Sequence, residues 1–114
     1  MRYDLCNQTA TVYHQEAVGS YTRTVYPNAF LDIKKTLNVD KTGSREASGF
    51  LLVIPGAVQS VFEGDKVLLG EGPEIATAQE WREFIPAKIP GLVVVSWADP
   101  KYFGGVIVHT EAGG

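Results

Sequence analysis

The sequence is poor in the residues from which disulfides and metal sites are built. Among 114 residues there is one cysteine, Cys6, and there are two histidines, His14 and His109. A single thiol excludes an intramolecular disulfide and gives no support for an oxidising compartment. One thiol and two imidazoles are also too few for the usual zinc sites. We therefore expect no metal ion and no cofactor.

Catalytic signatures are missing as well. No serine lies in the Gly-x-Ser-x-Gly elbow that frames a hydrolase nucleophile. The glycines near Asp65 and at 70–72 lack the Gly-Lys-Ser/Thr ending of a phosphate-binding loop, so they predict turns. His14 and His109 fall on predicted strands, where we expect surface or rim positions. The sequence thus predicts a protein that is not an enzyme and has no catalytic residues.

Long apolar runs and an excess of basic charge are absent too. The longest apolar runs, residues 50–54 and 92–95, are far shorter than the roughly 20 residues that span a bilayer. The mixed polar N-terminus has no apolar core of a signal peptide. A net charge of -3 argues against a general nucleic-acid binder. We expect a soluble protein of the cytoplasm or of a particle.

What the sequence does contain is a series of short runs rich in β-branched and aromatic residues, separated by Gly, Pro, Asn and Asp. A capping box at 77–80 predicts one helix of about two turns that ends before Pro86. Asp99-Pro100 predicts a turn, and residues 111–114 predict a loose tail. The predicted strands are residues 9–14, 21–26, 47–54, 66–72, 92–97 and 106–110, and residues 29–36 and 58–62 are two further candidates for extended structure. We expect a mainly β, single-domain barrel or sandwich over residues 1–114, with six to eight short strands and one short helix.

The polar stretch from Asn38 to Glu46 shows little periodicity and predicts a loop of nine residues. Such a loop is longer than the usual connection and is often functional. Four basic residues, Lys34, Lys35, Lys41 and Arg45, fall on and beside it. They favour either a solvated sheet edge or a loop that meets phosphates or an acidic partner. The candidate channel or partner loop consists of Asn38, Asp40, Lys41, Thr42, Arg45 and Glu46.

Two tryptophans and the C-terminal third supply candidates for an interface. Trp81 lies on the apolar face of the predicted helix, which favours packing as core or lid. Trp97, at a strand end, suits either the core or an interface anchor. The candidate interface residues are Lys34, Lys35, Trp97, Lys101, Tyr102 and His109.

Three stretches of the sequence together resemble the small head-to-tail connector proteins of tailed bacteriophages and prophages, also called minor capsid or head-closure (stopper) proteins. The first is 9–14 followed by 21–26 and Ala29-Phe30, and the second is 48–55 followed by the Gly-Asp to Gly-Glu-Gly pattern of 64–72. The third is 95–105, with its Asp-Pro-Lys-aromatic-Gly turn, followed by His109. After His109 the family usually has Trp and a Val-Gly pair, where this chain has Thr110-Glu111-Ala112-Gly113. Head-closure, adaptor and tail-terminator roles therefore stay open.

The resemblance implies a virion structural protein that forms a homo-oligomeric ring of six or twelve copies beneath the portal or adaptor ring. Such a ring closes the head, retains packaged double-stranded DNA and docks the tail proteins, and it assembles in the host cytoplasm. Edge strands would pair between subunits by β-addition, and the stretch 38–46 would reach into the channel or toward a neighbour. The family carries no catalytic residues, and no membrane contact is implied.

A different class of function also fits the predicted elements. Five or six short strands with one capped helix suit an OB-like nucleic-acid-binding module. Single-strand binders stack bases on aromatic side chains in a basic groove. The aromatic candidates for this role are Tyr13, Tyr21, Tyr26 and Phe30. The acidic balance and the scarcity of arginine argue against it.

Overall fold

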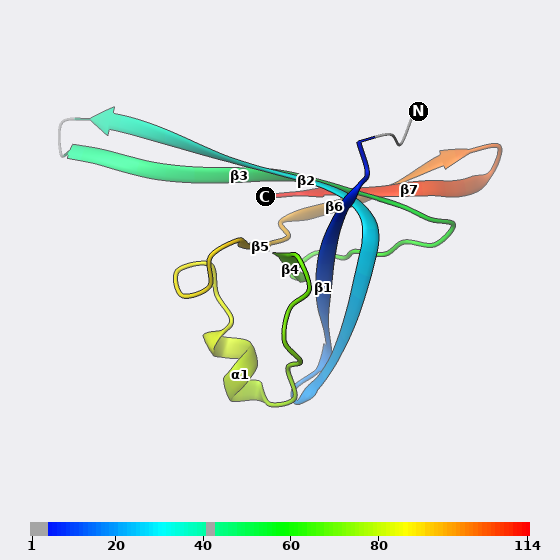
Figure 1. The fold of residues 1–114 in the computed structure, drawn as a ribbon, viewed down its shortest axis with the longest axis horizontal. Coiled ribbons are helices and arrows are strands. Elements are labelled where there is room, and N and C mark those ends of the chain that lie inside the picture. Colours follow the sequence, from blue (N-terminus) through cyan, green and yellow to red (C-terminus); the bar gives the residue numbers. More distant parts are fainter. Residues whose placement is uncertain (1–4, 41–42) are drawn as a thin grey trace.

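The chain folds into one seven-stranded antiparallel sheet that curls into a half-barrel, with a single short helix (Figure 1). The computed structural model describes residues 5–40 and 43–114, without the side chains of 34–40 and 43–48. The strand order is β5-β4-β1-β2-β3-β7-β6. The elements are β1 (Gln8–Ala17), β2 (Ser20–Asp40), β3 (Gly43–Pro55), β4 (Lys66–Leu69), α1 (Ala78–Glu83), β5 (Leu92–Val94), β6 (Trp97–Phe103) and β7 (Val106–Gly113). The predicted mainly β class and the single helix are confirmed.

Strand β2 joins the two halves of the sheet. Its first half pairs with β1, from Ala17↔Ser20 to Gln8↔Ala29, and its second half pairs with β3 from Phe30 onward. A second crossing lies between β5 and β6. There Val95 donates its N–H to the Asp65 carbonyl and Ser96 donates to the Gly113 carbonyl. These two crossings bend the sheet around its core.

The core lies inside the curl and extends to both faces of β1. Ala10 and Val12 pack in the main cluster with residues of β2, β3, β4 and β7. Thr11 and Tyr13, which alternate with them, are also fully buried. Their side of β1 is covered by the segment 70–73 and by α1. Strand β1 is therefore a central strand on both of its faces.

The stretch predicted as a loop is strand instead. Strands β2 and β3 pair from Phe30↔Val53 to Asp40↔Gly43, so residues 38–40 and 43–46 belong to a long hairpin that extends away from the body (Figure 1). We call the outer part of this hairpin, residues 34–48, the arm. Lys41 and Thr42 lie outside the described residues. The loop prediction was wrong because backbone hydrogen bonds form along a hairpin whether or not its sequence alternates apolar and polar residues.

Three further expectations from the sequence were wrong. The strands are not all short, because β2 has 21 residues and β3 has 13. Asp99-Pro100 lies inside β6, an edge strand on which the missing proline N–H can face solvent. The tail is not loose, since β7 runs to Gly113 and pairs with both β3 and β6.

The capping box is confirmed. The Glu80 N–H donates to the Thr77 hydroxyl oxygen, and the Glu80 carboxylate accepts from the Thr77 N–H. Just beyond the helix, Phe84 is buried, and Trp81 packs against the same cluster as Tyr13 and Leu92. The helix covers one side of β1, as the sequence predicts for Trp81.

We predict that Thr77→Ala lowers the free energy of unfolding by about 1 kcal/mol, because the first-turn amides lose their acceptor. Urea denaturation measures the change. Gln79→Ala, on the same helix and exposed, is the matched control and should stay within about 0.5 kcal/mol of wild type. Equal losses in the two variants would show that the cap contributes nothing specific.

Candidate functional site

Polar side chains of β1 and β2 fasten the segment after β4 to the sheet. The Thr11 hydroxyl donates to the Gly70 carbonyl at 2.7 Å and accepts from the Gly72 N–H at 3.0 Å. The Tyr13 hydroxyl donates to the Pro73 carbonyl at 2.6 Å, and Arg23 Nε donates to the Gly72 carbonyl at 2.8 Å. A Cβ at Gly72 would collide with the Tyr13 hydroxyl, so only glycine fits there.

A buried carboxylate holds the start of β4. Asp65, 1% exposed, accepts hydrogen bonds from the Phe62 N–H at 2.9 Å and bonds His14 Nδ1 at 2.6 Å. An imidazole oriented by a carboxylate supplies two of the three members of a catalytic triad. The hydrogen bonds found among the described residues bring no serine or cysteine to His14. The geometry therefore supports a structural tie between β1 and β4.

A second buried charge anchors the helix. Lys66 is buried, its Nζ lies 4.3 Å from the centre of the Trp81 ring, and it donates to the Trp81 carbonyl. Tyr21 stacks on the same ring, with 5.0 Å between centroids. Burial lowers the pKa of Lys66. Trp81 is thereby held against β2 by Tyr21 and against β4 by Lys66.

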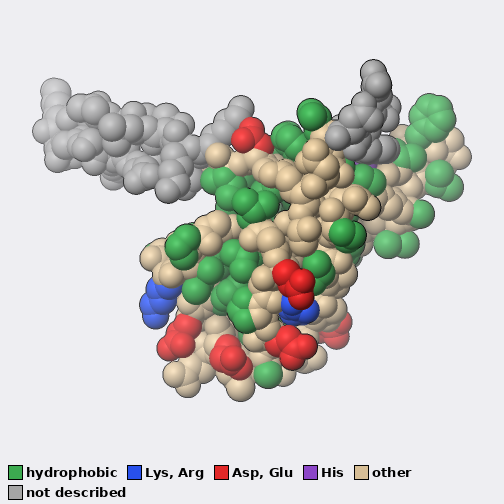
Figure 2. Space-filling view, in the orientation of Figure 1, with side chains coloured by type: hydrophobic (Ala, Val, Ile, Leu, Met, Phe, Trp, Pro, Cys, Tyr) green, Lys and Arg blue, Asp and Glu red, His purple; other side chains and the backbone are tan. Residues whose placement is uncertain are grey.

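The β6–β7 hairpin ends in an exposed apolar turn, which we call the tip (residues 102–106). Its side chains are open to solvent, with Tyr102 64%, Phe103 79% and Val106 59% exposed. The turn itself is Gly104-Gly105, both at positive φ, which favours glycine in tight hairpins. Hydrophobic side chains are visible at this end of the molecule (Figure 2). The tip thus presents two aromatic rings without covering structure.

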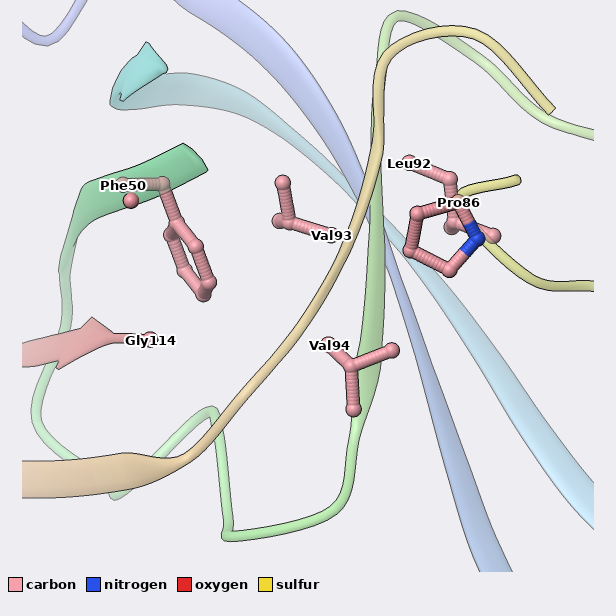
Figure 3. A pocket seen from close by; sticks show the side chains of 7 residues that line it. Phe50, Pro86, Leu92, Val93, Val94 and Gly114 are labelled. Carbon is pink, nitrogen blue, oxygen red and sulfur yellow. The ribbon is translucent and has the colours of Figure 1, made fainter. Parts of the chain in front are cut away.

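A second apolar surface is hollow. A groove of about 220 Å³ lies between the free edge of β5 and the base of the arm, near the end of β7 (Figure 3). Phe50 forms one wall, Val93 and Val94 lie opposite, and Pro86 and Leu92 extend that side (Figure 3). The groove residues are Gly49, Phe50, Pro86, Leu92, Val93, Val94 and Gly114.

The predicted interface residues are divided between surface and core. Tyr102 is on the tip, and Trp97 is 44% exposed, with its ring packed where a Cβ of Gly113 would lie. Lys101 bonds Asp99 at 2.7 Å. The surface or rim position expected for His109 was wrong, because it is 4% exposed and bonds Glu111 at 2.9 Å. The side chains of Lys34 and Lys35 lie outside the description.

Neither a metal site nor a membrane helix is found in the described part of the chain. There, no group of three or more His, Cys, Asp or Glu side chains could hold an ion. No helix within the same residues is long and apolar enough to cross a membrane.

A protein-family model matches residues 5–114, nearly the whole chain. The chain belongs to DUF6751, a family of unknown function. The comparisons with curated proteins and with solved structures gave no match. The family model covers the half-barrel, the arm, the tip and the groove together, so these features are parts of one family domain.

We predict that Tyr13→Phe weakens the alkaline loss of stability. Burial raises the pKa of Tyr13 above 10.0, so the folded state holds this proton more tightly than the unfolded chain. The stabilisation that this proton provides is fully present below the pKa that Tyr13 has in the unfolded chain. It is lost as the pH rises through the pKa of Tyr13 in the folded state. Urea denaturation at about pH 9 and about pH 11 should show a smaller decrease for Tyr13→Phe than for wild type.

The variant should also lose about 1 kcal/mol at neutral pH, because the Pro73 carbonyl loses its donor. Tyr102→Phe, at an exposed site, is the control and should keep the wild-type pH dependence. An unchanged alkaline slope in Tyr13→Phe would mean that other groups, such as the partly buried Tyr26, carry it.

Proposed function

We propose that this chain is a structural subunit of a phage virion at the head-tail interface. Copies form a ring under the portal or adaptor, close the head, retain the packaged DNA and dock the tail. The proposal rests on the sequence resemblance to small connector proteins together with the shape of the fold. Adaptor and tail-terminator rings of the same virion are the neighbouring roles.

The observation that carries the proposal is the arm. The β2–β3 ladder continues outward for residues 34–48, beyond the part of β3 that pairs with β7. The radius of gyration is 15.1 Å, whereas a compact chain of this length would have about 13 Å. An isolated two-stranded hairpin is marginally stable in water. An arm of this kind gains stability where it lies against other subunits.

The surfaces of the body agree with assembly. The tip and the groove are both apolar and both open. Exposed apolar patches on a small protein commonly mark contact sites with other proteins. Each subunit of a ring needs two such sites, one for each neighbour.

The OB-like alternative receives less support from the aromatic side chains. Tyr13 is fully buried, and Tyr21 is stacked on Trp81. Both rings are therefore engaged within the chain and are poor platforms for stacking bases.

We predict that the protein is present in purified DNA-filled particles, at a copy number equal to that of the portal or to half of it. Quantitative mass spectrometry of particles, with the portal protein as internal standard, makes the measurement. Absence from intact particles would contradict the proposal. Salt-sensitive binding of single strands by the monomer would then favour the nucleic-acid-binding module.

A second prediction concerns the arm. Replacing residues 39–45 with two glycines removes the end of the arm and leaves a three-residue loop, Asn38 and the two glycines, between the paired residues Leu37 and Glu46. We expect heads that lose DNA and attach few tails, measured by DNA content and by electron microscopy. Val58→Ser, an exposed change outside the arm, is the control and should behave as wild type. Full DNA retention and tail attachment in the shortened variant would show that the arm has no such role.

A further inference from the structure

The tip and the groove match in size and in apolar character. The groove holds about 220 Å³ and is lined by apolar side chains. A cavity of about 150 Å³ accommodates one benzene ring, so the groove has room for one aromatic side chain. The tip presents such a side chain, Phe103, next to two glycines that keep the turn narrow.

The edge of β5 also places backbone groups beside the groove. Gly91 accepts a hydrogen bond from the Leu69 N–H of β4, and Val95 donates to the Asp65 carbonyl just before β4. Between them Val93 is paired with Val67. In an antiparallel ladder the alternate residues direct their N–H and C=O groups the other way. The backbone of Val94 therefore points away from β4, and its carbonyl oxygen lies beside Gly114 at the rim of the groove.

The two surfaces belong to different sides of the body. The tip forms the right end of the molecule in Figure 1, whereas β5 and the chain end near the groove lie left of its centre. A copy that offers its tip to one neighbour thus keeps its groove free for another. Contacts between unlike surfaces propagate head to tail and close into a ring when the rotation allows it.

We propose that the tip of one copy enters the groove of the next copy, with the Phe103 ring between Phe50 and Val94. The inference rests on the proposed function, because it names the partner of these surfaces within the ring. The occupant is a second copy, since one chain carries both halves of the match and cannot join them itself.

The area of this contact sets its strength. The two exposed rings of the tip offer roughly 300 Å², whereas a stable interface buries about 800 Å² on each partner. Tip and groove alone therefore make a weak pair. The contact forms when subunits are held together at high effective concentration, as on a portal or within a closed ring.

Cross-linking with engineered cysteines tests the contact. In a Cys6→Ser background, Tyr102→Cys on the tip and Val94→Cys on the groove rim leave Phe103 in place. A short bismaleimide applied to assembled particles, and separately to the concentrated protein, should give a ladder of multimers. The pair Val18→Cys with Val94→Cys is the matched control, because Val18 is exposed on the distant β1–β2 turn. This control pair should give at least about tenfold less cross-linked multimer than the tip–groove pair.

Adding Phe103→Ser to the tip–groove pair should reduce the ladder by at least about tenfold. Adding Val58→Ser instead should leave it unchanged, and urea denaturation checks that both variants are folded. Equal ladders in the test and control pairs overturn the inference. Cross-linking of Val94→Cys to a different virion protein overturns it too.

The two proposals fail in different ways. A ladder from concentrated protein, with the chain absent from particles, keeps the tip–groove contact and overturns the virion role. The expected copy number in particles without a ladder keeps the virion role and overturns the contact.

Discussion

The fold depends on one strand, β2, that joins the two halves of the sheet. Strand β2 pairs with β1 up to Ala29 and with β3 from Phe30 onward, so the sheet must turn where the partner changes. The core lies inside that turn, and Ala29 and Leu31, on either side of it, are both buried. The arm is the continuation of the same ladder beyond the body. The curvature of the sheet, the position of the core and the arm therefore all follow from the change of pairing partner along β2.

The opposite side of the curl is held by polar contacts more than by long ladders. Strand β4 has four residues and β5 has three, too few to fix their position by backbone pairing alone. Buried hydrogen bonds from Thr11, Tyr13 and Asp65 supply the remaining constraint. Such groups are costly to bury unless every partner is present. This makes the position of β4, and with it the groove beside β5, well defined.

What the sequence predicted correctly is local. The opening hairpin and the capping box at Thr77 and Glu80 depend on residues a few positions apart. The tie between His14 and Asp65 joins residues 51 positions apart, which no local pattern reveals. The arm was missed because Val39 is the one large apolar residue in the stretch 38–46, too few to show alternation. The tail was misjudged because Gly113 indicates flexibility in isolation, whereas in the fold it leaves space for the Trp97 ring.

The edges of the sheet bear on how copies would meet. Strand β6 is the longer free edge of the body, yet Pro100 removes a donor from its middle and the Lys101–Asp99 pair adds charge beside it. Both features disfavour pairing of β6 with the edge strand of another copy. General β-addition along β6 is thus disfavoured, which leaves the side chains at its end, on the tip, as the surface for the proposed contact. A contact between one aromatic side chain and one groove has a fixed direction. A closed ring of subunits requires such a direction, whereas an aggregate lacks it.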